Sequence, residues 1–366
     1  MKHTGSISML HIIFLAMTVI GLKNHVTIIP AILNVASRDG WISVLSATLV
    51  LLPWIVLLLY IHKKTNMEPM KVWLRQKVGK VGSSVFGFLL AISLLVHASF
   101  TTSEMLQWIK YTFLNDTPSF ALLIFFTILS VLLITTSIQT IVMINVFVLV
   151  GVVAFGFFAA FTNLQVKDYV LLQPFFEHGF DPVLKAMVYP ASGLIELMLL
   201  LFLQHKIKDR IHFRHYLIMF FILTGLTLGP LVGAITEFGP SEANEQRFPA
   251  YEEWGLVQIG RYIEHLDFFS IYQWITGAFI RVGFMLYIIV DLFNLNGNKK
   301  MIWIYIAPAF FFISLALLQM SGSTFDEIKG KYMLPITFIV YFAFSLFLAS
   351  VAFFSGRSSK RLKHEM

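Results

Sequence analysis

The chain has 366 residues, of which 57% are hydrophobic and only 13% are charged, and its formal net charge is +7. Soluble globular domains carry roughly 25% charged residues, so this composition excludes a water-soluble class and indicates a membrane protein. The sequence contains no cysteine, which excludes disulfides, thiolate catalysis and zinc–sulfur sites.

The apolar runs are long enough to cross a hydrocarbon core of about 30 Å, which takes roughly 20 helical residues. We predict an all-α polytopic protein of ten spans, with ends accurate to a few residues. They lie at about 8–35, 41–62, 84–113, 118–137, 140–162, 183–205, 214–237, 268–293, 301–320 and 333–355. Nine or eleven spans fit the same pattern. The whole chain, 1–366, is predicted to be a single transmembrane domain.

Two of these runs are interrupted near their middle. The first changes at Gly21-Leu22-Lys23-Asn24-His25 and the sixth at Tyr189-Pro190-Ala191-Ser192-Gly193. Glycine and proline weaken a helix, and lipid cannot satisfy the backbone groups that a break exposes. Matching breaks in the two halves of a chain are typical of a transporter-like binding site at the bilayer midplane. The halves here would be about 8–162 and 183–355.

The loop charges predict the orientation. If the N-terminus is inside, the cytoplasmic segments hold roughly twice as many Lys and Arg residues as the outer segments. We therefore expect both termini to be cytoplasmic, in agreement with an even number of spans. The net positive charge then reflects topology and contact with anionic lipid headgroups. The basic residues are scattered among loops and form no face that reads bases, so we predict no nucleic-acid partner.

Few ionisable residues fall within the spans, where each one is costly and points to function. Lys23 is interpreted either as a cation that attracts a carboxylate ligand or replaces a coupling ion, or as a side chain that reaches the membrane interface. Glu196 is either a protonatable relay or the structural partner of Lys23 or Arg281. His97 is expected to be a hydrogen-bonded interior residue, and Glu104 and Asp291 are expected near the headgroups.

No motif indicates an enzyme. The sequence has no GxSxG elbow, no HExxH pair and no phosphate-binding loop, and its intramembrane carboxylates are isolated. We predict no catalytic activity, no cofactor and no metal.

Several short stretches together suggest a family. They are Arg38-Asp39-Gly40-Trp41-Ile42, Ala98-Ser99-Phe100, Thr117-Pro118, Leu172-Gln173-Pro174, Glu177-His178-Gly179, Glu196-Leu197-Met198-Leu199, Lys206-Ile207-Lys208, Arg261-Tyr262-Ile263-Glu264 and Trp274-Ile275. With these stretches in order over nearly its whole length, the chain resembles the B subunits of the GerA-type nutrient germinant receptors of bacterial spores. Those proteins belong to the amino acid–polyamine–organocation (APC) superfamily.

The resemblance implies a LeuT-like fold of ten helices in two inverted five-helix repeats, with helices one and six unwound at the ligand site. It implies an amino acid or similar small nutrient as ligand, and assembly with a larger A subunit and a lipoprotein C subunit in the spore inner membrane. In one respect the chain departs from the superfamily, whose helix-one break is usually glycine-rich and uncharged, because Lys23 lies in this break.

We therefore expect a germinant-sensing membrane subunit whose two breaks bind the ligand. The predicted ligand-binding residues are Gly21, Leu22, Lys23, Asn24, Phe100, Thr101, Tyr189, Pro190, Ala191, Ser192, Gly193, Gly277 and Arg281. Backbone N–H groups and helix-end dipoles at the breaks would hold a carboxylate. Two alternatives remain: a proton-coupled amino-acid permease with Glu196 or Lys23 as a charge relay, and a structural membrane scaffold.

Overall fold

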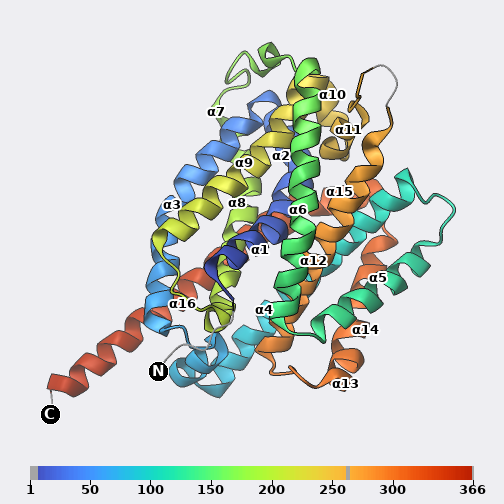
Figure 1. Cartoon of the computed structure of the whole chain (residues 1–366). Coiled ribbons are helices and arrows are strands. Elements are labelled where there is room, and N and C mark those ends of the chain that lie inside the picture. The colour runs from blue at the N-terminus through green and yellow to red at the C-terminus, as the bar shows by residue number, and fades with distance from the viewer. Residues whose placement is uncertain (1–6, 261–263, 365–366) are drawn as a thin grey trace.

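A computed structural model describes residues 7–260 and 264–364 (Figure 1). Within these residues the chain is helical and forms no β-strand beyond a single bridge between Ile7 and Ile207. Helices satisfy their own backbone hydrogen bonds, as a chain in lipid requires. The predicted all-α polytopic class is confirmed.

The first half begins with one long, interrupted helix. Its elements are α1 (Met9–Leu22), the π-helical turn η1 (Lys23–Thr27), α2 (Ile29–Ala36), η2 (Ser37–Asp39), α3 (Gly40–Thr65), α4 (Met70–Thr112), α5 (Ser119–Ile134) and α6 (Ile138–Thr162). Helix α4 bends at Gly79, where φ is 75° and ψ is 179°. A positive φ of this kind is accessible to glycine without strain.

Short 3-10 segments, η3 (Asn163–Val166) and η4 (Tyr169–Leu172), lead to the second half. Its elements are α7 (Phe180–Ala186), α8 (Val188–Leu194), η5 (Ile195–Phe202), η6 (Gln204–Lys206), α9 (Phe213–Phe238), α10 (Pro240–Glu245), α11 (Pro249–Gly255), η7 (Leu266–Phe268), α12 (Phe269–Leu292), α13 (Lys299–Met301), η8 (Ile302–Ile306), α14 (Ala307–Leu318), α15 (Gly322–Ile328), η9 (Lys329–Met333) and α16 (Leu334–His364).

Nine helical segments of the described residues are long and apolar enough to cross a membrane. The span expected at about 118–137 corresponds to α5, which has 16 residues and is shorter than the others. Each remaining predicted span overlaps one of the nine segments, except that the first is divided: Met9–Thr27 forms one segment, and the rest is continuous with the second span in Ile29–Thr65. The inverted-repeat relation between the two halves stays a prediction.

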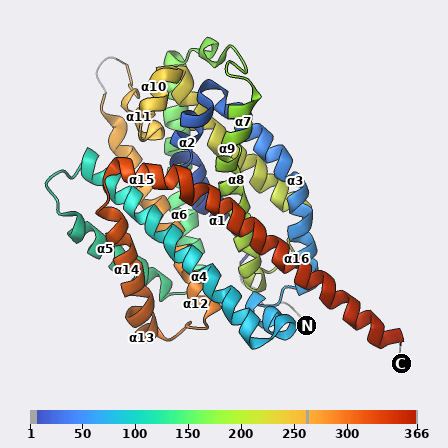
Figure 2. The same ribbon diagram turned by 180° about the vertical axis from the view of Figure 1, so that it is seen from behind.

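The segments differ in how deeply they are buried. We compare the share of residues that is buried within an 18-residue apolar stretch of each segment. This share is 78% in Leu266–Leu292 and 72% in Phe180–Phe202, but only 22% in Ile138–Val166. Helix α12 packs against α1, α4, α5 and α6. The core of the bundle is thus built around α12, α1 and the interrupted sixth span, and α6 has large exposed apolar side chains such as Phe147. Figure 2 shows the long helix α16 running diagonally across one face of the bundle and projecting beyond it.

Loops predicted to lie on one side of the membrane meet at one end of the molecule. At the predicted cytoplasmic end, His62 hydrogen-bonds Gln204, and His205 pairs with Asp291. At the opposite end, the backbone N–H of Asp168 donates to the carbonyl of Thr236, and Arg247 pairs with Asp326. The loops therefore separate into two groups as the alternating order of the spans predicts, and which group is cytoplasmic stays a prediction.

The sixth span differs from the prediction. Tyr189 to Gly193 lie within helix α8, and the bend comes earlier, at Met187. Pro190 explains this shift, because it has no N–H for the carbonyl four residues back, at Ala186, where α7 ends. After Leu194 the chain tightens into the 3-10 helix η5. Eight residues are unusually long for this conformation, and mid-helix 3-10 segments often mark functional hinges.

The first span also stays helical through its predicted break. Lys23 to Thr27 form a wide π-helical turn between α1 and α2. Such turns are rare and frequently occur at functional sites. Neither of the two spans is unwound as the resemblance implied. Their irregularity consists of a widened turn in one and a tightened stretch in the other.

Candidate functional site

The two irregular segments bring three charged side chains together in the centre of the bundle. The Lys23 ammonium lies 2.9 Å from Glu196 Oε1. The Arg281 guanidinium, from α12, donates to both carboxylate oxygens of Glu196, at 2.7 Å and 2.9 Å. All three side chains are at most 2% exposed. We call Lys23, Glu196 and Arg281 the central cluster.

Further hydrogen bonds hold the two cations in place. Lys23 Nζ donates to the carbonyl of Ser192 at 2.8 Å. Arg281 donates to the Thr101 hydroxyl at 3.1 Å and to the carbonyl of Val19. Lys23 does not reach an interface, so the structure selects the interpretation in which it is buried. Glu196 is the ionic partner of both cations at once.

Two positive groups share one carboxylate, so the central cluster has an excess charge of +1 when all three groups are ionised. Burying an unneutralised charge is costly because protein solvates it less well than water does. These hydrogen bonds use two of the three N–H donors of Lys23 and four of the five of Arg281. The cluster can therefore accept an additional anionic group.

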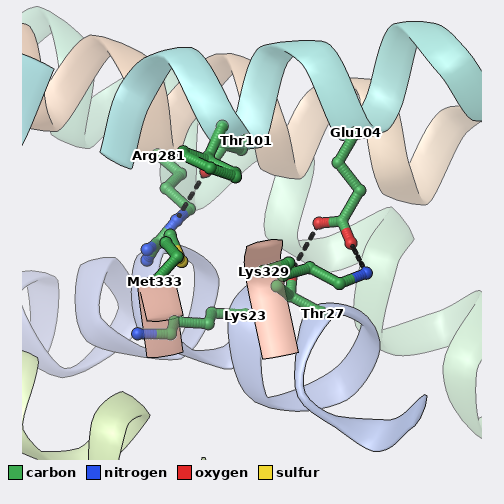
Figure 3. Close-up of a pocket in the computed structure, with 8 residues that line it drawn as sticks. Lys23, Thr27, Thr101, Glu104, Arg281, Lys329 and Met333 are labelled. Atoms are coloured by element: carbon green, nitrogen blue, oxygen red, sulfur yellow. Dashed lines mark hydrogen bonds and ion pairs between the residues drawn. The ribbon is translucent and has the colours of Figure 1, made fainter. Parts of the chain in front are cut away.

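A small cavity lies beside this cluster (Figure 3). Its volume is about 10 Å³, which is enough for roughly one water molecule. The lining side chains come from the first, third and eighth predicted spans and from the turn η9, where the tenth span begins. They are Lys23, Thr27, Phe100, Thr101, Glu104, Arg281, Lys329 and Met333. Four charged groups thus converge on one small space.

A second ionic group borders the cavity on the side of the predicted outer loops. Lys329 Nζ lies 2.7 Å from Glu104 Oε1 and 2.9 Å from Asp326 Oδ1. The Thr27 hydroxyl donates to the other oxygen of Glu104 at 2.7 Å. Asp326 also pairs with Arg247 at 2.6 Å. We call Glu104, Lys329, Asp326 and Arg247 the outer cluster.

Three predicted site glycines serve close packing instead of lining the cavity. A Cβ on Gly193 would come within 1.7 Å of Asn24 Oδ1, so the first and sixth spans touch at this point. A Cβ on Gly21 would meet Leu226 at 2.9 Å, and one on Gly277 would meet Leu22 at 3.1 Å. Close approach at Gly193 is what brings the carbonyl of the adjacent Ser192 within reach of Lys23.

Of the predicted ligand-binding residues, Lys23, Phe100, Thr101 and Arg281 line the cavity. The other predicted residues do not line it: Gly21, Leu22, Asn24, Tyr189, Pro190, Ala191, Ser192, Gly193 and Gly277. His97 is an interior residue that hydrogen-bonds the Ser93 carbonyl at 2.6 Å and Thr337 at 2.7 Å, as expected. The motif residues Arg261, Tyr262 and Ile263 lie outside the described residues.

Sequence reasoning missed the outer half of the cavity. Glu104 was given no part in the site, but its buried carboxylate is ion-paired with Lys329 on the cavity wall, and its place near the headgroups stays a prediction. Lys329 was assigned to an outer segment, and it is 3% exposed. One signal was present for Glu104, which follows Thr101 by three residues and therefore shares its face of α4. Nothing local identifies Lys329, because its partner Glu104 is 225 residues away in sequence.

A larger cavity, of about 240 Å³, opens at the predicted cytoplasmic end. Lys71, His205, Lys206 and Asp291 are among its lining residues. Asp291 pairs there with His205 and Lys206, in keeping with its predicted place near the headgroups. This cavity lies among loops and helix ends, whereas the smaller one lies where the two irregular spans meet.

A bundle of long apolar helices with a buried charged cavity at two irregular helices defines a polytopic membrane protein. A family model described as "Spore germination protein" matches residues 5–323, and the chain belongs to this family. It is 38% identical to spore germination protein XB of Bacillus anthracis, over 90% of this chain and 92% of that protein. It is 23% identical to spore germination protein A2 of Bacillus subtilis (strain 168), over 88% of this chain and 87% of that protein. The resemblance found in the sequence is thereby confirmed.

Proposed function

We propose that the chain is the membrane subunit of a nutrient germinant receptor, and that it binds a small carboxylate-bearing nutrient such as an amino acid at the central cluster. Its family and its spans make it a germination-related integral membrane protein. Binding would trigger germination from the spore inner membrane, with both termini cytoplasmic. A larger A subunit and a lipoprotein C subunit would be its partners.

The observation that carries this proposal is the excess positive charge of the central cluster. A carboxylate that enters the cavity would neutralise it and use the remaining donors of Lys23 and Arg281. The cavity of about 10 Å³ is too small for an amino acid, so its walls must move apart on binding. A ligand that favours the expanded arrangement shifts the equilibrium toward it, and partner subunits can detect that shift.

Lys23→Met tests this directly, because it removes the excess charge and keeps the two bonds between Glu196 and Arg281. Purified wild-type protein should gain thermal stability with one or more of the twenty amino acids, and much less with the corresponding carboxamides. The Lys23→Met variant should lose about tenfold or more in affinity, as expected when a hydrogen bond to a charged group is lost. Lys331→Met is the matched control, since Lys331 is 67% exposed and pairs only with the exposed Glu327. Equal stabilisation by acids and carboxamides would contradict carboxylate recognition.

A second candidate function is proton-coupled amino-acid uptake, which the burial of Lys23 beside a second cation, Arg281, on the one carboxylate of Glu196 favours. A lysine that shares its carboxylate with an arginine can release a proton and leave the pair neutral. Proteoliposomes that contain the chain should then accumulate labelled amino acid only when a pH gradient is imposed. Binding without accumulation supports the sensor, whereas gradient-driven accumulation that Lys23→Met abolishes supports the permease.

A further inference from the structure

The outer cluster contains a cation at the place where a second end of a ligand would come to rest. Lys329 is 3% exposed and Glu104 is 5% exposed, and their charged atoms are 2.7 Å apart on the cavity wall. Figure 3 shows Lys329 and Thr27 converging on Glu104 of α4, with Thr101 farther along the same helix and in contact with Arg281 of α12. The cavity is therefore bordered by an excess of positive charge at one side and by a carboxylate at the other.

We propose that Lys329 is a built-in competitor for the position at Glu104 where the ammonium of an α-amino acid would bind. This inference rests on the proposed function and specifies its ligand class. Thr101 and Glu104 are three residues apart on α4, which places them on one face about 5–6 Å apart at Cβ. The Thr101 hydroxyl accepts a hydrogen bond from Arg281, so Thr101 lies on the side of the cavity where the ligand carboxylate would bind. A ligand whose carboxylate and ammonium are joined to one carbon can reach both sides.

Lys329 has an alternative partner that makes such an exchange feasible. Its ammonium already contacts Asp326, which is 30% exposed and lies farther from the cavity. Release from Glu104 would therefore leave Lys329 paired. Glu104 would not be paired, and an unpaired buried carboxylate is strongly unfavourable. Only a ligand that brings its own cation can complete the exchange, so the site selects amino acids over simple carboxylic acids.

The backbone around Lys329 is suited to this movement. Lys329 begins the π-helical turn η9, and Met333, which also lines the cavity, ends it. A π-helical turn is a local departure from α-helical winding, and methionine adapts readily to a changed space. The turn connects α15 to the long helix α16, which crosses the bundle toward the opposite end (Figure 2). Displacing Lys329 would thus widen the cavity and act on a helix that extends beyond the bundle.

The first experiment uses ethylammonium chloride, which mimics the end of the lysine side chain. Lys329→Ala leaves Glu104 unpaired and should lower the melting temperature of the full chain in detergent. Ethylammonium should restore most of the loss, whereas equal concentrations of sodium chloride should not. The double variant Lys329→Ala/Glu104→Gln should show no such response, and Lys331→Ala should behave as wild type. If Lys329→Ala is recovered only when ethylammonium is present during purification, that also counts as restoration.

A second experiment keeps the inference testable whatever the stability of Lys329→Ala. Glu104→Gln/Lys329→Met removes both charges, and replacing a whole buried pair is often nearly neutral for stability. Glycine and acetate form the smallest pair of probes that differ by the ammonium. Wild type should prefer glycine, and the double variant should lose this preference by roughly tenfold.

The results separate the inference from the proposed function. Ethylammonium restoration needs neither the central cluster nor a natural nutrient, so it can succeed when every amino acid fails to bind. The inference is overturned if ethylammonium stabilises Lys329→Ala and its Glu104→Gln double variant equally or not at all. It is also overturned if the Glu104→Gln/Lys329→Met variant retains the wild-type preference for glycine over acetate.

Discussion

The two ionic clusters that border the cavity are built on opposite plans. In the central cluster two cations share one carboxylate, and all three side chains are at most 2% exposed. In the outer cluster two cations, Lys329 and Arg247, pair with the two carboxylates of Glu104 and Asp326, so the charges balance, and the outermost acid, Asp326, is 30% exposed. Side chains in a fully buried cluster cannot exchange their partners with water. Side chains can do so in a cluster whose exposure increases from one end to the other. The comparison indicates that the central cluster is the fixed receptor for charge and the outer cluster is the part that moves.

The largest effect should come from removing the one anion of the central cluster. Glu196→Gln leaves Lys23 and Arg281 buried side by side, and breaking a buried pair in this way costs about 3–5 kcal/mol. We expect a sharp fall in melting temperature or in yield after membrane extraction. Glu327→Gln, at the exposed pair with Lys331, should have little effect. If the two variants had similar stability, the buried ion pairs of Glu196 would contribute no more to stability than the exposed pair of Glu327, and the distinction between them would be wrong.

A smaller loss of stability should follow when the Ser192 carbonyl, which accepts a hydrogen bond from Lys23, is displaced. A Cβ at position 193 would overlap Asn24 Oδ1 at 1.7 Å, so Gly193→Ala must separate the first and sixth spans. Overpacking of this kind costs about 1–3 kcal/mol. The separation should also weaken the bond from Lys23 to the Ser192 carbonyl and reduce ligand affinity. Adding Asn24→Gly should recover much of the stability; a Gly193→Ala variant with wild-type stability and binding would argue against the close contact.

The smallest effect is expected at the edge of the outer cluster. Asp326→Asn removes the more exposed partner of Lys329, which is also the partner of the partly exposed Arg247, and leaves the contact with Glu104 intact. Partly exposed ion pairs contribute about 1 kcal/mol or less, so the melting temperature should change little. If Lys329 needs Asp326 to leave the cavity, ligand affinity should nevertheless decrease. A large loss of stability with unchanged affinity would assign Asp326 to the fixed part of the structure.

Much of the architecture could be predicted from the sequence because hydrophobic length and loop charge are local properties. The helical class, most spans and the grouping of the loops at two ends agree with the structure. The interruption of span six lies at Met187, two residues before the predicted break begins at Tyr189, since Pro190 interrupts the helix at the preceding turn instead of at its own position. The site was half predicted: Lys23, Phe100, Thr101 and Arg281 line the cavity as expected, whereas its other lining residues were not predicted, and these are Thr27, Glu104, Lys329 and Met333.

By itself, the sequence determined that this chain spans a membrane, that its first and sixth spans are irregular, and that it belongs to a spore germination family. Only the tertiary structure decided what the buried charges do. Whether Lys23 reaches an interface or pairs with Glu196, and whether Lys329 faces water or Glu104, depends on contacts between residues 173 and 225 positions apart. Such pairing is set by how helices pack, because the cost of burying a charge is offset only by a partner that the fold brings close.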